Sequence, residues 1–163
     1  MTEPVRYPYL PEVGRFRYVP ADNPFMRLAR SCAKNHSLDK TMPTGAVIVN
    51  SGVIIGEGAN GSSYHDKYGC ERVRQGIPTG QRYELCEGCH PKNHAEAKAV
   101  ADAINQGKDT TGAELYLWGH WWACEPCWTT VLASGITTIC LQEGSEVLFN
   151  KNHPDNVVGR QFQ

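Results

Sequence analysis

The feature that most restricts the fold of this chain is a pair of predicted helix starts that carry metal-binding side chains. His94 and Glu96 stand at the start of one helix, and Cys124 and Cys127 stand at the start of the next. Cysteines at positions i and i+3 lie on one face of a helix, so both sulfurs can reach the same ion. The free amides of a helix N-terminus also favour thiolates. A fold that uses this set must bring the two helix N-termini together.

Two cysteines and one histidine provide three protein ligands for a tetrahedral zinc ion and leave one position for water. Zinc lowers the pKa of that water to about 7 and so produces hydroxide at neutral pH. Glu96 is not needed for coordination, and its carboxylate can move protons between water, a ring nitrogen and a leaving amine. The set therefore predicts a catalytic zinc held by His94, Cys124 and Cys127, with Glu96 as the proton shuttle.

Other interpretations of the same residues remain open at this point. Asn93-x-x-Glu96 matches a capping box, in which Glu96 would only cap its helix. Cys124-Glu-Pro-Cys127 resembles the Cys-x-Pro-Cys pair of thioredoxin-like oxidoreductases, which cycles between dithiol and disulfide. A redox pair does not require a His-x-Glu sequence at a separate helix start, which favours the metal interpretation. A non-catalytic zinc-binding interaction module is a third alternative.

The hydrophobic pattern around these motifs predicts an α/β domain. The expected elements are a helix over 24–35, a hairpin over 46–55, a helix over 94–106, a strand over 113–118, a helix over 125–134 and a strand over 136–141. The last strand–helix–strand unit implies parallel pairing with helices covering the sheet. Gly56, Gly58 and Gly61 predict a flexible turn after the hairpin, and residues 1–22 are expected to be extended.

Length and charge limit the class of protein. With 163 residues, the chain is expected to form a single domain over 1–163. A formal net charge of -1 provides no global basic field for nucleic acid, which makes a nucleic-acid partner unexpected, although a local basic groove is not excluded. No apolar run of about 18 residues is present, so no membrane span is expected. The start has no secretory pattern, which predicts a cytoplasmic protein.

The combined motifs resemble a known family. His-x-Glu followed by Pro-Cys-x-x-Cys is the signature of zinc deaminases, with the difference that Ala123 stands here before the first cysteine and Pro126 falls between the two. Further matching segments are 44–49, 58–61, 69–72, 76–80, 82–86 and 112–116. With these segments, the chain resembles the deoxycytidylate (dCMP) deaminases of the cytidine deaminase superfamily.

The resemblance implies hydrolysis of dCMP to dUMP and ammonia by a homo-oligomeric enzyme. It also implies a three-layer α/β/α fold with a central mixed sheet of about five strands. Asn60 resembles the asparagine that contacts the nucleotide sugar, although an Asn-Gly turn is an ordinary structural feature as well. Residues 89–93 and 118–123 depart from the family pattern beside the pocket. Nucleosides, modified pyrimidines and single-stranded nucleic acid therefore remain alternative substrates.

The tryptophans near the second motif allow two interpretations. Trp118, Trp121, Trp122 and Trp128 surround the turn that leads to the cysteines. They are expected to pack in the core, but a stacking surface for bases is the alternative.

Residues 62–93 form a Cys/His-rich insertion without a clear apolar pattern, and they predict a second, structural zinc. Polar chain of this length needs a cross-link to order it, which zinc with four ligands can provide. The expected ligands are His65, Cys70 and Cys86, with Cys89 favoured over His90 as the fourth because of the Cys86-x-x-Cys89 spacing. The alternative is a set of free thiols and a surface histidine.

Overall fold

The computed structural model describes residues 4–78 and 81–163 of the chain, and within them all side chains except those of His65, Asp66 and Glu84. Its centre is a five-stranded mixed sheet in the order β1-β5-β4-β2-β3. The strands are β1 (Arg15–Val19), β2 (Gly45–Asn50), β3 (Val53–Ala59), β4 (Glu114–Trp118) and β5 (Thr138–Gln142). β1 and β4 each pair with β5 in parallel, and β2 pairs with β3 and β4 antiparallel. The parallel pairing expected across the last strand–helix–strand unit is confirmed.

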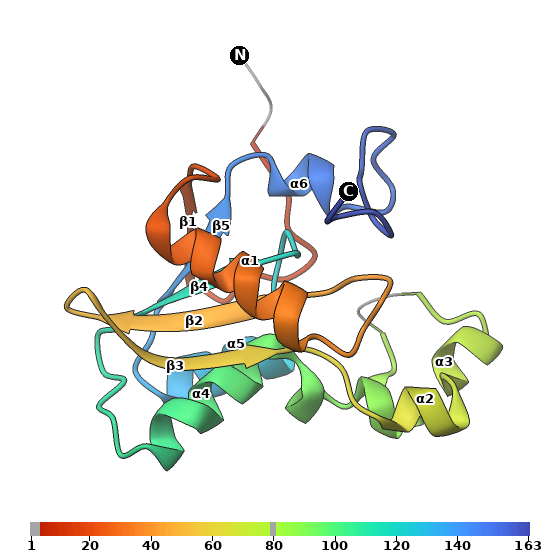
Figure 1. Cartoon of the computed structure of the whole chain (residues 1–163), viewed down its shortest axis with the longest axis horizontal. Coiled ribbons are helices and arrows are strands. Elements are labelled where there is room, and N and C mark those ends of the chain that lie inside the picture. The colour runs from red at the N-terminus through yellow and green to blue at the C-terminus, as the bar shows by residue number, and fades with distance from the viewer. Residues whose placement is uncertain (1–3, 79–80) are drawn as a thin grey trace.

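Helices cover both faces of this sheet. The longer ones are α1 (Pro24–His36), α4 (Ala95–Asn105) and α5 (Glu125–Ala133). The shorter ones are α2 (Tyr64–Tyr68), α3 (Glu71–Arg74) and α6 (Ser145–Leu148), with 3-10 turns η1 (Tyr83–Leu85), η2 (Glu87–Cys89) and η3 (Pro91–Asn93). Figure 1 shows α1 on one side of the sheet and α4 and α5 on the other.

Alternating side chains divide the core into two layers, because successive residues of a strand point to opposite faces. The layer under α4 and α5 contains Ala46, Ile48, Leu115, Leu117, Ile139 and Leu141, all buried. The layer under α1 contains Val47, Val49, Tyr116, Trp118 and Cys140. The expected three-layer α/β/α architecture is therefore confirmed.

Two glycines bring α4 close to the sheet. A Cβ atom on Gly58 would lie 2.5 Å from the Ala99 backbone nitrogen, and one on Gly56 would lie 2.6 Å from the Ala99 carbonyl oxygen. Both glycines belong to β3 and, two residues apart, face the same helix. The prediction that Gly56 and Gly58 form a flexible turn is wrong, because they extend the strand and allow close packing of α4.

The start of α4 decides between two interpretations of Glu96. The N-cap residue is His94, and no side chain caps this helix end. Asn93 lies in η3, where its side-chain amide donates to the carbonyl oxygens of Glu87 and Gly88. The capping-box interpretation of Asn93 and Glu96 is therefore wrong, since Asn93 lies outside the helix and bonds elsewhere.

The N-terminal segment contributes an unexpected strand. Residues 15–19 pair with β5 as the edge strand β1, with Phe16 and Tyr18 turned inward and Arg15 and Arg17 exposed. The extended conformation was expected, whereas the pairing was not. The described residues of 62–93 form α2, α3 and the three 3-10 turns, which lie together at one end of the sheet (Figure 1). None of the helices in the described ranges is long and apolar enough to span a membrane.

Candidate metal centre and catalytic site

The starts of α4 and α5 bring His94, Cys124 and Cys127 together. Nδ1 of His94 lies 3.2 Å from Sγ of Cys127 and 3.6 Å from Sγ of Cys124. Zinc–nitrogen and zinc–sulfur bonds at a tetrahedral angle separate these atoms by roughly 3.5 Å. The three side chains, called the first cluster below, therefore have both the donor types and the spacing that fit one zinc ion.

The core holds both helix starts in place. Cys124 is the N-cap of α5 and Cys127 lies in its first turn, completely buried. His94 is the N-cap of α4, whose next residue, Ala95, is also completely buried. The first cluster therefore has a geometry that the packing of two helices on one sheet imposes.

The ring of His94 has two further contacts. It is hydrogen-bonded to the backbone of Cys89, and the ring of Tyr83 packs edge-on against it with centroids 4.8 Å apart. A histidine that binds a metal through one ring nitrogen commonly donates the other N–H to a carbonyl or carboxylate, which orients the ring. These contacts keep Nδ1 directed toward the two sulfurs.

Glu96 lies beside the first cluster on the first turn of α4. Only 6% of its surface is exposed. Burial raises the pKa of its carboxyl group, while the nearby His94 opposes this change and Cys124 adds to it. Its carboxyl group also hydrogen-bonds to Cys127. A buried carboxyl with a raised pKa next to a metal-binding set is suited to receive and return protons.

The two thiols of the first cluster differ in proton affinity. The hydrogen bond with Cys127, together with contact with His94, lowers the pKa of Cys124 to about 5 despite its burial. The same hydrogen bond and burial raise the pKa of Cys127. One thiolate is therefore favoured at this helix start even before a metal binds.

Two adjoining cavities open at the first cluster. The smaller has a volume of about 520 Å³, and Asn60, Cys89, His94, Glu96 and Cys124 are among the residues that line it. The larger has a volume of about 1000 Å³. Seven of the described residues line both cavities: Met42, Ile77, Tyr83, His120, Trp122, Cys124 and Lys151. A small molecule in the smaller cavity would therefore contact Glu96 together with His94 and Cys124 of the first cluster.

Asn60, which follows β3, has structural contacts as well as a place in the smaller cavity. Its Oδ1 accepts from the Thr44 amide at 2.8 Å and from the Ser37 hydroxyl at 2.5 Å, and its Nδ2 donates to the Met42 carbonyl at 2.9 Å. These bonds join β3 to the loop that precedes β2. Asn60 therefore shapes the cavity wall, and a role in sugar binding remains a prediction.

The insertion brings three more sulfurs together. Ligand atoms of Cys70, Cys86 and Cys89, called the second cluster below, all lie within 4.8 Å of one another. Sγ of Cys70 and Cys89 are 3.4 Å apart, too far for a disulfide and close to the roughly 3.8 Å expected of two sulfurs on one zinc. His90 is exposed, and its Nδ1 accepts from the Lys92 amide. The side chain of His65 lies outside the described part of the structure, although α2, which carries it, contacts η2.

Arg72, to which the sequence analysis assigned no role of its own, stabilises the surroundings of the second cluster. This buried guanidinium donates to the carbonyl oxygens of Gln81 at 2.8 Å and Pro78 at 2.6 Å and to Sγ of Cys89 at 3.3 Å. It also lies over the Tyr83 ring, 4.6 Å from its centroid. No local pattern in the sequence predicts its burial or its contacts, because its partners come from three separate turns.

The four tryptophans do not form one surface. Trp118 of β4 is buried under α1, and Trp128 of α5 is buried in the core layer on the opposite face of the sheet. Trp122 is buried against the first cluster. Trp121 is partly exposed and lines the larger cavity. Three of the four thus pack in the core, as expected.

Comparison with known proteins agrees with this site. Residues 20–143 match the family described as the cytidine and deoxycytidylate deaminase zinc-binding region. No curated protein sequence matches the chain.

Similar solved structures include three deaminases. A diaminohydroxyphosphoribosylaminopyrimidine deaminase/reductase from Thermotoga maritima is 25% identical with a TM-score of 0.46, and the match covers 73% of this chain but 29% of that one. The dCMP deaminase of cyanophage S-TIM5 is 21% identical with a TM-score of 0.49, covering 78% and 87%. Guanine deaminase from Bacillus subtilis is 20% identical with a TM-score of 0.45, covering 74% and 64%.

The matched residues include strands β2 to β5 and both helix starts that carry the first cluster, whereas β1 lies before them. A zinc-binding region agrees with the zinc-type ligands found at these helix starts and does not support a thiol oxidoreductase. Since residues 20–143 are most of the chain, the protein belongs to the family of cytidine and deoxycytidylate deaminases that share this zinc-binding region.

Proposed function

We propose that the protein hydrolyses dCMP to dUMP and ammonia, with zinc held by His94, Cys124 and Cys127. The observation that carries this proposal is a cluster of three zinc-type ligands, two of which, His94 and Cys124, line the same cavity as the buried Glu96. Zinc bound there supplies a nucleophile at neutral pH by lowering the pKa of a water molecule to about 7.

Glu96 does the proton transfer in this proposal. Its carboxylate takes a proton from the attacking water and delivers it to the ring nitrogen beside the 4-amino group. It then carries the second proton to the leaving amine, so water and dCMP become dUMP and ammonia. The raised pKa of Glu96 suits this role, because the group must both accept and release protons near neutral pH.

The choice of dCMP rests on the segments that resemble the dCMP branch. Members of these segments, among them Asn60, Gly69, Arg72 and Tyr83, line the smaller cavity beside Glu96. We propose that Asn60 contacts the sugar there, using the Nδ2 proton that does not bond to Met42. We also propose a homo-oligomeric cytoplasmic enzyme, which sedimentation and cell fractionation would test.

An ammonia-release screen tests the substrate. We expect turnover of dCMP and much slower turnover of deoxycytidine, with cytidine, CMP and a cytosine-containing oligonucleotide as comparisons. Equal rates on dCMP and deoxycytidine would show that the phosphate is not recognised. Turnover of the oligonucleotide alone would show that the substrate is single-stranded nucleic acid. Trp121, which lines the larger cavity, would then be expected to stack on a base.

We propose that the second cluster holds a structural zinc, with Cys70, Cys86 and Cys89 as ligands and His65 as the fourth. Three thiols grouped in a segment of short helices and turns support this proposal. The position of α2 beside η2 supports His65. Purified protein would then contain about two zinc ions per chain, one for each cluster.

A further inference from the structure

His120 is placed at the border of the two cavities by the loop that joins β4 to α5. The preceding residue, Gly119, has a φ of +97°, and a Cβ atom there would lie 2.3 Å from the Pro43 carbonyl oxygen. Only glycine allows this close approach and this backbone conformation. The Trp122 ring then packs edge-on against the His120 ring, with centroids 5.8 Å apart. Backbone and ring contacts together therefore hold the imidazole in one position.

Hydrogen bonds determine which nitrogen of His120 carries the proton. Nδ1 accepts from the backbone amide of Trp121 at 3.0 Å and from that of Trp122 at 3.3 Å. A nitrogen that accepts from two amides is unprotonated, so the proton of the neutral ring must be on Nε2. Burial, with smaller effects of His94 and Lys151, lowers the pKa of His120 to about 4. The ring is thus a neutral donor through Nε2 at physiological pH.

The Nε2–H group of His120 is available to a ligand. His120 lines both cavities. Among the described residues no partner bonds to Nε2, and this nitrogen is not one of the buried side-chain atoms that lack a partner. It therefore remains accessible from the cavities as a hydrogen-bond donor that the fold itself does not use.

Lys151 adds a positive charge at the same place. It follows α6, lines both cavities and is close enough to His120 to influence its protonation. A cation beside a fixed neutral donor is suited to an oxyanion, because both interactions are stronger with a charged acceptor. The smaller cavity, of about 520 Å³, is lined by Glu96, by His94 and Cys124 of the first cluster, and by His120 and Lys151.

We propose that His120 and Lys151 form the phosphate subsite of the nucleotide, with the Nε2–H of His120 donating to a phosphate oxygen. This inference rests on the proposed function, since it assigns the phosphate contact of the same substrate. The base lies toward Glu96, and the phosphate lies where the two cavities join. Discrimination between dCMP and deoxycytidine then depends on these two side chains.

Two substitutions separate the ligand contact of His120 from its backbone contacts. In His120→Asn the amide oxygen can replace Nδ1 as acceptor for the Trp121 and Trp122 amides, but no donor reaches the former Nε2 position. In His120→Gln the amide nitrogen can reach that position, but the acceptor for the backbone amides is lost. A structural role predicts damage in the Gln variant, whereas phosphate binding predicts damage in the Asn variant.

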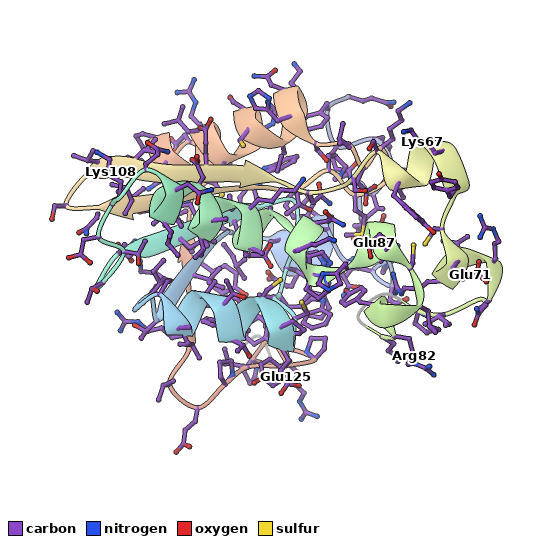
Figure 2. All side chains as sticks on the ribbon, turned by 90° about the horizontal axis from the view of Figure 1, so that it is seen from below. Lys67, Glu71, Arg82, Glu87, Lys108 and Glu125 are labelled. Carbon is purple, nitrogen blue, oxygen red and sulfur yellow. The ribbon has the colours of Figure 1, made fainter. Side chains whose placement is uncertain are left out.

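The experiment measures kcat and KM for dCMP and deoxycytidine, with calorimetric binding of dUMP and deoxyuridine to the zinc-loaded protein. We expect His120→Asn and Lys151→Ala each to raise KM for dCMP and Kd for dUMP about 10-fold or more. Values for deoxycytidine and deoxyuridine should stay within about 2-fold, with the melting temperature and zinc content unchanged. His120→Gln should recover part of the affinity for dUMP. Lys108→Ala removes the same charge as Lys151→Ala and is the control. Lys108 lies at the opposite end of the molecule from Arg82, which lines the larger cavity (Figure 2).

The outcomes distinguish this inference from the proposed function. Turnover of dCMP with unchanged KM in His120→Asn and Lys151→Ala would overturn the phosphate subsite and leave the function standing. Binding of dUMP that depends on both residues, without turnover of dCMP, would overturn the function and leave the subsite standing. Equal losses for dCMP and deoxycytidine in His120→Asn would assign His120 to the base instead and overturn the inference.

Discussion

The two cysteine clusters differ in what holds their sulfurs together. The first cluster stands on the N-termini of α4 and α5, which pack on the sheet through completely buried residues such as Ala99 and Val131. The second cluster stands on short helices and turns, in a segment where Tyr68 and Val73 are 60% and 75% exposed. Apolar packing therefore positions the first set of ligands, whereas the second set lies on short helices and turns that the proposed structural zinc would cross-link. A metal at the first cluster would act in chemistry, and one at the second would act in folding.

Contacts between the clusters connect these two roles. The backbone of Cys89 hydrogen-bonds to the His94 ring, and Tyr83 packs between Arg72 and that ring. Arg72 in turn donates to Sγ of Cys89. The conformation of residues 62–93 therefore affects the first cluster, because these contacts orient the His94 ring. Four substitutions test this comparison.

Cys124→Ala should have the largest effect, because it removes a ligand of the first cluster. We expect loss of all deaminase activity and of one zinc ion per chain, with the sheet and helices retained in circular dichroism, since the core does not depend on this ligand. Metal analysis and ammonia release measure the two losses. Protein that contains no zinc and forms a reversible Cys124–Cys127 disulfide would contradict the proposed chemistry.

Glu96→Gln should leave the first cluster occupied and remove only the proton transfer. We expect the zinc content to stay unchanged and kcat to fall about 10²-fold or more, the usual scale for general acid–base catalysis. Since α4 is not capped by Glu96, the melting temperature should change little. Full activity in the Gln variant would show that Glu96 does not move protons.

Much of this fold could be predicted from local patterns. Asn23 accepts from the Phe25 and Met26 amides and so begins α1 where a polar residue before proline indicated it. The turn between β2 and β3 lies at Ser51 and Gly52, between β-branched runs. The spacing of Cys124 and Cys127 was equally informative, because two residues one helical turn apart need no tertiary information to share a face.

What the sequence did not indicate depends on contacts between distant segments. The residues of β1 alternate in burial, but prolines on both sides and a short length hid a strand that only pairing with β5 defines. Gly56 and Gly58 indicated a turn when taken locally, and only α4 explains them. Arg72 lies in a segment that resembles the family and His120 in one that departs from it, but their contacts could not be predicted, since their partners lie in other turns or are backbone amides.

Cys86→Ser should affect stability more than chemistry. Cys86 is only 2% exposed and belongs to the second cluster. We expect one zinc ion per chain instead of about two, a lower melting temperature, and faster hydrogen exchange over residues 62–93. Activity should fall only as this segment loses order. Cys32→Ser, a change at another buried cysteine in α1, should leave both zinc ions in place and serves as the control.

One zinc ion in the wild type, fully retained in Cys86→Ser, would contradict a metal at the second cluster. The insertion would then be ordered by Arg72 and by apolar contacts alone. The protein would then have one metal centre, at the first cluster, and the second cluster would be a group of cysteines without a metal.

Arg72→Lys should have the smallest effect, because it keeps the charge and changes only the geometry of donation. A lysine ammonium cannot reproduce a planar guanidinium that bonds to two carbonyls and a sulfur while lying over Tyr83. Loss of one or two such bonds costs about 1–2 kcal/mol, which lowers the melting temperature by roughly 2–8 °C.

The same substitution tests whether the clusters are coupled. If Arg72 supports the second cluster, zinc release to a chelator should become faster from that site, and kcat should fall less than about 5-fold through looser orientation of His94. Arg74→Lys, at an exposed arginine of the same helix, should change neither value. An activity loss in Arg72→Lys as large as that of Glu96→Gln, with unchanged zinc release, would mean that Arg72 acts on the substrate directly in the smaller cavity that it lines. The second cluster would then be independent of the first.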